Sequence, residues 1–342
     1  MNTIYKKIFK VFNENNIFTK EKFKKKNFEF FLGKLHNYHF KNSEEYKKIY
    51  SKNKKKNFFI TADLFKQKKL TSIKDNLIWR KIRSSGTTGE FSKIYLSKEN
   101  ALAQSMVLKK ILNFYFRRKY IIIFLENPNS EYYNAQIAAI NGFSLIAKEK
   151  VFPFKNNKLN LKIILNKIKQ TKKNEKIIIF GFTSTIWSFF NKKNSYEFKN
   201  KFKNITIIHG GGWKKLENSK VTRNFFKNFL KKKFGINKVI NYYGLVEQIG
   251  SIFLECNKGY FHTSSFSDIK ILDKNLDIEK EKKKGIVQLI SLLPTSYPGY
   301  SILTQDEGLV HGLDDCKCGL PGKYFEIYGR VKRAELRGCS NV

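Results

Sequence analysis

The chain has 342 residues, of which 67 are Lys or Arg and 28 are Asp or Glu, giving a formal net charge of +39. Hydrophobic residues make up 41% of it, enough to bury a substantial core in one large domain or two ordinary ones, so a disordered tail is excluded. The excess charge alone suggests nucleic acid or an anionic membrane surface as a partner. However, the lysines lie in scattered short runs among many Asn, Ile and Phe residues, as on solvated helix faces, and no nucleic-acid-binding motif is recognisable. We therefore expect no nucleic-acid partner.

Neither a membrane span nor a secretion signal is predicted. The longest apolar runs, such as residues 121–125, have the length of a strand and fall far short of the ~18 apolar residues of a membrane helix. The first residues lead into the polar run 13–16, where a signal peptide would have its apolar stretch. We expect a cytoplasmic protein without a transmembrane segment.

Residues 1–80 are predicted to form a mostly helical N-terminal segment, and no chemistry is recognisable in them. Apolar residues recur there at helical spacing, as at Phe23, Phe28, Phe31, Leu32 and Leu35.

Residues 81–251 alternate between short β-rich runs and helical stretches. The runs 120–125, 176–180, 205–208 and 238–242 are expected to be buried strands, and the stretches 104–116, 159–170 and 221–234 to be helices. This alternation predicts an α/β fold with a parallel sheet and flanking helices. Ligands of such sheets bind beyond the carboxyl ends of the strands, and here polar, Gly-rich segments follow three of them, at 181–185, 210–213 and 243–247.

Residues 252–328 become rich in strands and turns, with several Pro and Gly residues, so we expect a smaller β-rich subdomain there. Residues 329–342 are left as a hinge and a tail that carries a cysteine.

The first segment that suggests chemistry is the loop formed by Ser84, Ser85, Gly86, Thr87, Thr88 and Gly89. It offers four hydroxyls and two glycines in six residues, and glycines let backbone N–H groups approach a phosphate closely. Lys93 follows and would meet a phosphate or a carboxylate. The loop does not match the nucleoside-triphosphatase pattern, which requires Lys next to Ser or Thr after the second glycine.

The loop resembles the signature of the adenylate-forming superfamily, which includes acyl-CoA synthetases and luciferases. In that family the loop handles the β- and γ-phosphates of ATP. Residues 243–247, Tyr-Gly-Leu-Val-Glu, are similar to the family's Tyr-Gly-x-Thr-Glu element, which implies that Glu247 serves the Mg²⁺ ion. Val246 stands where the family has Thr, so one hydroxyl contact to the phosphate is missing from the pattern.

Further elements follow in the family's order. The resemblance implies adenine-side positions at Gly210, Gly211, Gly212, Tyr242, Tyr243 and Gly244. It also implies that Asp306 holds the ribose hydroxyls and that Arg330 is the hinge arginine. The implied fold is the N-terminal domain of adenylate-forming enzymes, and the implied cofactors are ATP and Mg²⁺.

Within the superfamily, the chain is most similar to the acyl-protein synthetases, the LuxE-type component of bacterial fatty acid reductase. The strings that carry this resemblance are 181–184, 209–213, 243–251, 296–299 and 334–340, and it covers residues 58–342. Phenylacetate-CoA ligases are similar at a greater distance. The implied reaction is activation of a long-chain fatty acid to acyl-AMP, transfer to a cysteine, and delivery to an acyl reductase. We expect the acyl pocket to be lined by Gly181, Thr183, Trp187 and Trp213.

Adenylate-forming enzymes continue past the hinge into a lid domain with a catalytic lysine, whereas this chain ends at Val342, so we expect the lid and its lysine to be absent. Lys93 or Lys332 would then support adenylation. In the resembling family a cysteine near the carboxyl terminus accepts the acyl group, and Cys339 matches it. A thiolate is well suited to attack an acyl-adenylate, and nearby cations such as Arg337 would lower the pKa of this thiol. The alternative is an exposed tail cysteine without a role.

The remaining three cysteines, Cys256, Cys316 and Cys318, form a separate group with His262. Three thiolates and an imidazole make a tetrahedral set suited to structural zinc, although the spacing differs from a standard finger or ribbon. His311 is a substitute ligand. The competing interpretation is three inert buried cysteines and a core histidine.

Two other functions stay open. An adenylate-forming ligase would pass the acyl group to CoA, or to an amine or hydroxyl of an envelope sugar. A basic binding protein that has lost catalysis would hold nucleic acid or anionic lipid. Whether light emission is involved is not determined by the sequence.

Overall fold

The computed structural model describes residues 3–13, 17–52, 57–84, 91–117, 119–129, 132–191, 202, 204–279 and 282–331. Contacts divide the chain into two compact units, which we describe separately. The first unit comprises Met1–Ile111, Tyr132–Ala135 and Gly244–Val342, and the second comprises Leu112–Glu131 and Gln136–Tyr243. The four predicted domains, 1–80, 81–251, 252–328 and 329–342, are contiguous stretches of sequence, whereas each unit combines segments that are distant in the sequence. The predicted boundaries therefore stay a prediction.

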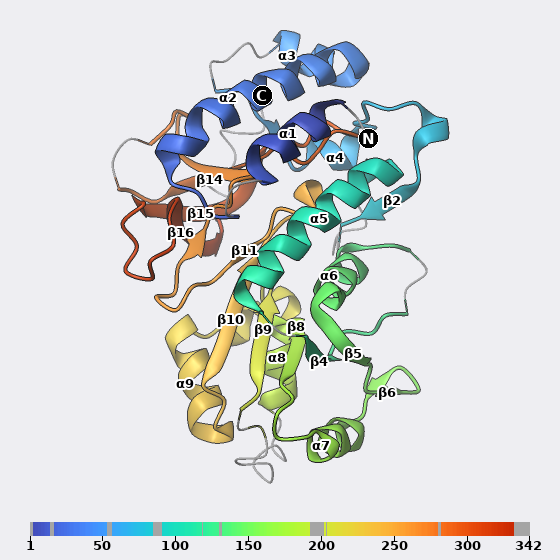
Figure 1. Ribbon diagram of the computed structural model, residues 1–342, viewed down its shortest axis with the longest axis vertical. Helices are drawn as coiled ribbons and strands as arrows, with labels where there is room; N and C mark the ends of the chain where they lie inside the picture. Colours follow the sequence, from blue (N-terminus) through green and yellow to red (C-terminus); the bar gives the residue numbers. More distant parts are fainter. Residues whose placement is uncertain are drawn as a thin grey trace. The chain divides into compact units, whose positions relative to one another are not determined.

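The second unit is built on a parallel sheet with the strand order β10–β9–β8–β4–β5 (Figure 1). The strands are β4 (Tyr120–Phe124), β5 (Ala147–Val151), β8 (Ile177–Phe182), β9 (Thr206–Gly210) and β10 (Lys238–Tyr243). A short hairpin of β6 (Phe154–Lys155) and β7 (Lys158–Leu159) follows β5. The predicted strands and the parallel sheet are confirmed.

Helices cover both faces of this sheet. Alternate strand residues such as Ile121, Ile179 and Ile207 share one core with residues of α7 (Leu161–Gln170), α8 (Thr183–Phe190) and α9 (Arg223–Phe234). On the other face, Phe143 of α6 (Ala135–Phe143) packs against Phe180 with ring centroids 4.6 Å apart. The period-2 alternation of side chains produces these two apolar faces.

The first unit contains an antiparallel sheet with the order β12–β16–β15–β14–β13, and β1 (Ile60–Thr61) pairs in parallel with β15. The other strands of this sheet are β12 (Phe261–His262), β13 (Ser267–Leu272), β14 (Gly285–Ser291), β15 (Ser301–Leu313) and β16 (Lys323–Arg330). The two-residue strand β11 (Phe253–Leu254) is not part of it. The expectation of a β-rich part in addition to the parallel sheet is confirmed, while its bounds of 252–328 stay a prediction.

N-terminal helices pack on this β-rich part of the first unit. They are α1 (Thr3–Asn13), α2 (Glu21–Asn42), α3 (Glu44–Lys52) and α4 (Leu64–Gln67), and α5 (Lys98–Tyr115) belongs to this unit up to Ile111. From α1, the Tyr5 hydroxyl donates to the carbonyl of Leu293 at 2.5 Å. From α2, the buried Lys24 Nζ donates to the carbonyl of Ser267 at 2.7 Å. Segments from opposite ends of the sequence therefore share one core.

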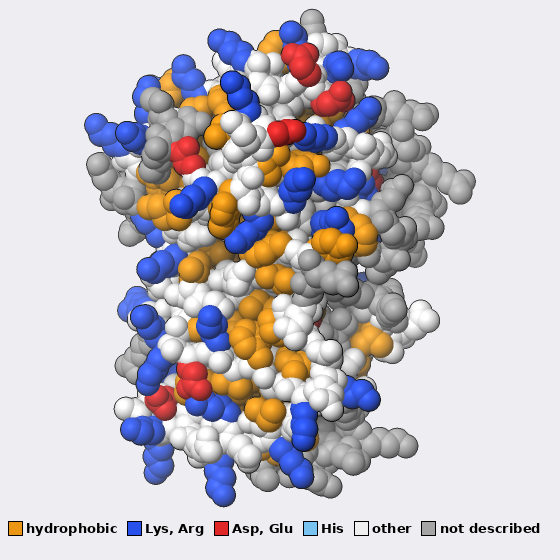
Figure 2. Space-filling view, turned by 90° about the vertical axis from the view of Figure 1, so that its right-hand side faces the viewer, with side chains coloured by type: hydrophobic (Ala, Val, Ile, Leu, Met, Phe, Trp, Pro, Cys, Tyr) orange, Lys and Arg blue, Asp and Glu red, His pale blue; other side chains and the backbone are white. Residues whose placement is uncertain are grey.

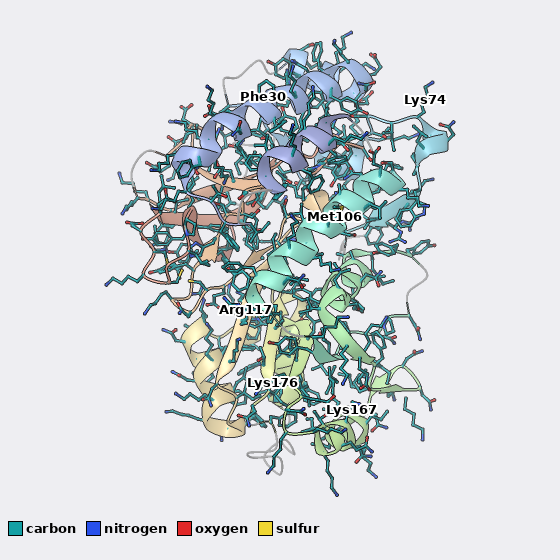
Figure 3. All side chains as sticks on the ribbon, in the orientation of Figure 1. Phe30, Lys74, Met106, Arg117, Lys167 and Lys176 are labelled. Atoms are coloured by element: carbon teal, nitrogen blue, oxygen red, sulfur yellow. The ribbon has the colours of Figure 1, made fainter. Side chains whose placement is uncertain are left out.

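The surface is strongly basic but mixed. Figure 2 shows Lys and Arg side chains spread over the visible face among uncharged ones, with few acidic groups between them. In Figure 3, Phe30 on α2 and Met106 on α5 are labelled, and they are 56% and 46% exposed. No helix in the described part of the chain is long and apolar enough to cross a membrane.

Candidate active site and metal centre

The predicted phosphate loop connects two short antiparallel strands of the first unit, β2 (Arg80–Arg83) and β3 (Lys93–Leu96). At its base, the backbone N–H of Ser84 donates to the carbonyl of Ser92 at 3.1 Å, and the N–H of Ser92 donates to the Ser84 hydroxyl at 2.9 Å. Ser84 is half-buried and Lys93 is exposed. Ser85, Gly86, Thr87, Thr88 and Gly89 lie outside the described residues.

Glu247 lies in the short 3₁₀ helix η5 (Val246–Gln248) and is buried, with 5% of its surface exposed. Burial raises the pKa of its carboxyl group, while a hydrogen bond with the Ser92 side chain acts in the opposite direction. Since Ser92 also closes the base of the phosphate loop, the first unit brings the base of the loop and the predicted magnesium carboxylate to one point.

An ion pair between Lys66 and Asp63 acts on the Glu247 carboxylate. The Lys66 ammonium lies 2.5 Å from Asp63 Oδ1, and the amide of Gln305 donates to Asp63 Oδ2 at 2.5 Å. The Lys66 charge lowers the pKa of Glu247 and the Asp63 charge raises it, although burial has the larger effect. Gln305 precedes Asp306 on β15, so this group extends toward the predicted ribose ligand.

The side-chain amide of Gln248 fixes the position of η5. Gln248 Nε2 donates to the carbonyls of Leu289 at 3.0 Å and Gly299 at 2.9 Å. A Cβ on Gly299 would lie 2.7 Å from the carbonyl oxygen of Glu247, which explains the glycine. The Oε1 atoms of Gln104 and Gln248 are buried and have no hydrogen-bond partner among the described residues.

Asp306 and Arg330 are direct cross-strand partners on β15 and β16. Asp306 is half-buried, and its N–H donates to the Thr304 hydroxyl at 3.0 Å. Arg330 is exposed, and the next residue, Val331, donates to the carbonyl of Gln305 at 2.9 Å. The structure therefore brings together two residues that are 24 positions apart in the sequence, as the register shows.

In the second unit, the glycines after β9 lie beside the end of β10. A Cβ on Gly210 would lie 2.4 Å from the Tyr242 ring, so glycine is required there. The Tyr242 ring is buried against Phe143 and Phe180, and burial raises the pKa of its hydroxyl. The predicted adenine-side residues differ in exposure. Gly211 has a left-handed φ of 71° and is exposed, as is Gly212. Tyr243 is half-buried, whereas Tyr242 belongs to the core of this unit. Gly244 begins the third segment of the first unit.

Of the four residues expected in the acyl pocket, Gly181 lies near the end of β8, Thr183 and Trp187 lie in the following helix α8, and Trp213 follows β9. Trp187 and Trp213 meet edge to face, with ring centroids 5.7 Å apart. A Cβ on Gly181 would lie 3.2 Å from the Ile186 side chain. Thr183 Oγ1 lies 2.9 Å from His209 Nδ1 and within 3.2 Å of the carbonyls of Gly210 and Gly211.

Because the Thr183 hydroxyl has carbonyl acceptors for its own proton, it accepts a hydrogen bond from His209 Nδ1. Burial lowers the pKa of His209 to about 3, with smaller contributions from Lys227 and Arg223, so the ring is neutral. Its Nε2 is then an acceptor, and it is buried without a partner among the described residues. The end of β9 thus presents an unsatisfied neutral imidazole beside the expected acyl-pocket residues.

The Cys/His cluster, defined as Cys256, His262, Cys316 and Cys318, is assembled in the first unit. The potential ligand atoms of all four residues lie within 4.8 Å of one another. His262 Nε2 lies 3.3 Å from Cys318 Sγ, and the hydrogen-bond partners of the ring are the thiols of Cys256 and Cys318. His311 is not part of the cluster, because its Nε2 lies 2.8 Å from the Glu326 carboxylate.

Two thiols of the cluster accept backbone hydrogen bonds, and their pKa values are shifted in opposite directions. The backbone N–H of Lys258 donates to Cys256 Sγ and that of Leu320 donates to Cys318 Sγ, each at 3.4 Å. Burial raises the pKa of Cys256, but hydrogen bonds from His262 and the backbone outweigh it and lower the value to about 6. Burial and the neighbouring thiols raise the pKa of Cys318 to about 12. The residues fit a tetrahedral metal ion, which would remove the repulsion between the thiolates.

Some predicted residues are untested and some neighbours were missed. Cys339 and Lys332 lie outside the described residues. Ser92 was not predicted, although its side chain hydrogen-bonds with Glu247. Tyr297 belongs to the string 296–299 but was given no role, and its interaction with the Glu247 charge places it nearby. The buried Glu126, whose carboxylate accepts the N–H of Phe182 at 2.8 Å, was not predicted either. Glu126 directly follows a predicted strand, a signal that would have found it.

Two curated relatives are similar over most of the chain. The long-chain-fatty-acid--luciferin-component ligase of Aliivibrio fischeri is 25% identical over 288 residues, which cover 82% of this chain and 75% of the relative. The ligase of the same name from Vibrio harveyi is 23% identical over 298 residues, with the same coverage.

Solved structures of ligases share the fold. An open conformation of 2-hydroxyisobutyryl-CoA ligase aligns with a TM-score of 0.65 and 13% identity, covering 89% of this chain and 74% of the ligase. ATP-bound MatB from Rhodopseudomonas palustris aligns with a TM-score of 0.52 and 14% identity over 76% of this chain. The chain spans about half the length of MatB, 49%.

The family profile described as acyl-protein synthetase, LuxE, matches residues 8–342. The chain therefore belongs to the LuxE family of acyl-protein synthetases and has the fold of adenylate-forming ligases.

Proposed function

We propose that this protein activates a long-chain fatty acid with ATP and then carries the acyl group on its own cysteine. The observation that supports this most strongly is the family match over residues 8–342, together with a buried carboxylate beside the phosphate loop. The names of the two relatives contribute the substrate class, a long-chain fatty acid, and the description of the family contributes a protein as the acceptor.

In the first half-reaction, a carboxylate oxygen of the fatty acid attacks the α-phosphorus of ATP, and pyrophosphate leaves. Bound Mg²⁺ would offset the charge of the phosphates. Glu247 would hold this ion, and the loop from Ser84 to Gly89 would hold the leaving phosphates. Lys93 would supply positive charge. Asp306 would hold the ribose hydroxyls, with Arg330 as the hinge arginine.

In the second unit, Gly210, Gly211 and Gly212 would contact the adenine side, with Tyr243. Tyr242 would act there from the core, by supporting the glycine turn through its packing on Gly210. The acyl group would be surrounded by Thr183, Trp187 and Trp213, and by Gly181, which has no side chain to fill the space.

In the second half-reaction, the thiolate of Cys339 would attack the acyl carbon, a thioester forms and AMP leaves. The thiol proton passes to solvent or to a base. The acceptor of the thioester is proposed to be an acyl reductase. We also propose a cytoplasmic location, and a structural zinc ion in the Cys/His cluster.

Cys339→Ser separates the two half-reactions. Fatty-acid-dependent exchange between pyrophosphate and ATP should continue, whereas stable labelling of the protein by radioactive fatty acid, released by hydroxylamine, should vanish. Ser340→Ala is the neighbouring control and should keep both. Labelling that persists in Cys339→Ser would exclude this cysteine, and normal turnover of that variant with CoA or an amine would favour a different acceptor.

A further inference from the structure

The Cys/His cluster and the Asp306–Arg330 pair are connected by a single β-hairpin. The ladder between β15 and β16 runs from Leu313 opposite Lys323, beside the turn with Cys316 and Cys318, to Asp306 opposite Arg330. Figure 1 shows the two strands side by side. The register of this ladder therefore decides whether Asp306 and Arg330 face each other.

Two single-residue bulges interrupt the ladder, one in each strand. Beyond Val310 the register shifts so that His311 is the extra residue of β15, and beyond Glu307 it shifts so that Tyr328 is the extra residue of β16. Because the bulges lie in opposite strands, their shifts cancel. Losing one of them would move the register by one residue and turn one strand's side chains to the other face of the sheet.

Glycines make these bulges possible. A Cβ on Gly308 would lie 2.6 Å from Val287 Cγ2 and 2.8 Å from the carbonyl oxygen of Glu326. A Cβ on Gly312 would lie 2.5 Å from Asp315 Oδ1. Gly329 has a φ of 115°, a left-handed value that other residues rarely adopt.

The side chains of the two extra residues meet on one carboxylate. His311 Nε2 lies 2.8 Å from Glu326 Oε2, and the Tyr328 hydroxyl donates to the same oxygen at 3.2 Å. Glu326 thus connects the bulge of β15 with the bulge of β16. We call this arrangement the Glu326 clamp.

The other end of the hairpin is organised around the cluster. The N–H of Asp314 donates to the carbonyl of Gly322 at 3.1 Å, and the N–H of Gly322 donates to Asp314 Oδ1 at 2.7 Å, which closes the turn that carries two thiols. His262 on β12 pairs with Tyr324 on β16, and the two rings stack. A metal ion would join this turn to β12 and to the Cys256 turn.

We propose that a zinc ion in the Cys/His cluster fixes the tip of the β15–β16 hairpin and, with the Glu326 clamp, sets the register that positions Asp306 opposite Arg330. Four protein ligands leave no open coordination position, so the ion does no chemistry itself. Zinc with bonds of about 2.0 to 2.3 Å places neighbouring ligand atoms about 3.5 Å apart, close to the observed spacing of His262 and Cys318. The positioning role rests on the proposed function, because the nucleotide roles of Asp306 and Arg330 belong to it.

The first test measures the metal without measuring activity. The full-length protein, purified without chelators, should contain about one zinc ion per chain. Its cobalt-substituted form should show the visible bands of tetrahedral cobalt and a thiolate-to-cobalt charge-transfer band. The double variant Cys316→Ser, Cys318→Ser should lose both, and Cys339→Ser should keep both. A wild-type protein without zinc, or a double variant that retains it, would overturn the proposal.

The second test measures positioning. In the double variant, the KM for ATP in pyrophosphate exchange should rise about ten- to hundredfold, while the KM for fatty acid stays unchanged. Glu326→Ala should raise the KM for ATP in the same direction with its zinc content intact, and Glu326→Gln, which keeps an acceptor oxygen, should restore most of it.

A variant that destabilises the same unit elsewhere is the control. Tyr46→Phe removes one hydroxyl of the buried Tyr46–Tyr300 hydrogen bond, 2.7 Å long, and leaves the hairpin untouched. If Tyr46→Phe raised the KM for ATP as much as the double variant does, general destabilisation would explain the effect and the positioning role would be wrong. A wild-type protein without ATP-dependent exchange would instead contradict the proposed function, while the zinc and cobalt results would still stand.

Discussion

Strand β8 of the second unit is buried from Ile177 to Phe182, whereas β15 of the first unit is buried only up to Thr304 and is mostly half-buried beyond it. β8 lies between parallel neighbours in a continuous ladder, and β15 carries bulges, glycines and charged residues. The regular apolar sheet provides a core, and the irregular sheet provides positions for Asp306 and for His262 of the Cys/His cluster. In this protein, chemical groups are concentrated where the sheet is least regular.

The largest effect is expected in the apolar sheet. Ile179→Ala should lower the free energy of unfolding by about 2–5 kcal/mol, because Ile179 is fully buried and its loss leaves a cavity. Leu309→Ala on the half-buried part of β15 is the matched control and should cost about 1 kcal/mol. Urea unfolding of both variants checks the contrast, and equal losses would contradict it.

The next effect concerns activity without loss of stability. Glu247→Gln should lower pyrophosphate exchange at least ~100-fold, because an amide is a poor magnesium ligand. Burial raises the folded-state pKa of Glu247, so the stability that this group contributes in its protonated form is lost as the pH rises from the unfolded-state pKa through the folded-state pKa. The variant should therefore unfold at the same or a higher temperature at pH 7. Normal exchange in Glu247→Gln would remove this carboxylate from the site.

His39 in the first unit and His209 in the second are both buried, and the two are predicted to share a pH dependence. Burial lowers the pKa of His39 and of His209 to about 3. Because the unfolded state binds a proton near pH 6.5 and the folded state does not, stability is complete above about 6.5 and falls as the pH drops toward 3. Below about pH 6.5, each histidine should lower the free energy of unfolding by an amount approaching about 1.4 kcal/mol for each pH unit of acidification.

Urea unfolding between pH 6.5 and 5 checks this, since that window lies above the ordinary titration of carboxylates. His39→Gln and His209→Gln should each reduce proton uptake on unfolding, by about half a proton at pH 6.5 and by nearly one at pH 5. His39 contacts Ser72 Oγ at 2.8 Å and the Pro294 carbonyl at 3.2 Å, whereas His209 has one nitrogen without a described partner. His39→Gln should therefore destabilise the protein more at pH 7, and the opposite order would show that His209 Nε2 is satisfied.

The smallest effect is expected at the basic surface. Lys167 of α7, labelled in Figure 3, lies 2.6 Å from Glu149 of β5, and the two side chains are 22% and 46% exposed. Lys167→Gln should change the free energy of unfolding by about 0.5 kcal/mol or less, because solvent and salt screen such pairs. A larger loss that persists in high salt would assign this pair to the core of the second unit.

Local patterns were sufficient for much of the fold. The predicted strand 120–125 became β4 and the predicted helix 221–234 became α9, because long apolar runs and helical spacing are local properties. The helix start was readable as well: Thr222 caps α9, and Gly235 ends it with a φ of 73°. Cys256, His262, Cys316 and Cys318 were grouped by residue type alone, and the structure brings these four together.

Contacts between distant segments could be decided only by the tertiary structure. The pairing of Ile60 with Ile302 and the hydrogen bond from Ser92 to Glu247 join segments that no local pattern relates. The two cancelling bulges of β15 and β16 could not be predicted from local pattern either, because a bulge exists only in relation to its partner strand. The sequence by itself determined most of the candidate side chains, such as Glu247 and the Cys/His cluster, because residue type and local motif are readable without a structure. The burial, register and pairing of these side chains were decided by packing and long-range hydrogen bonds, because these depend on the whole chain at once.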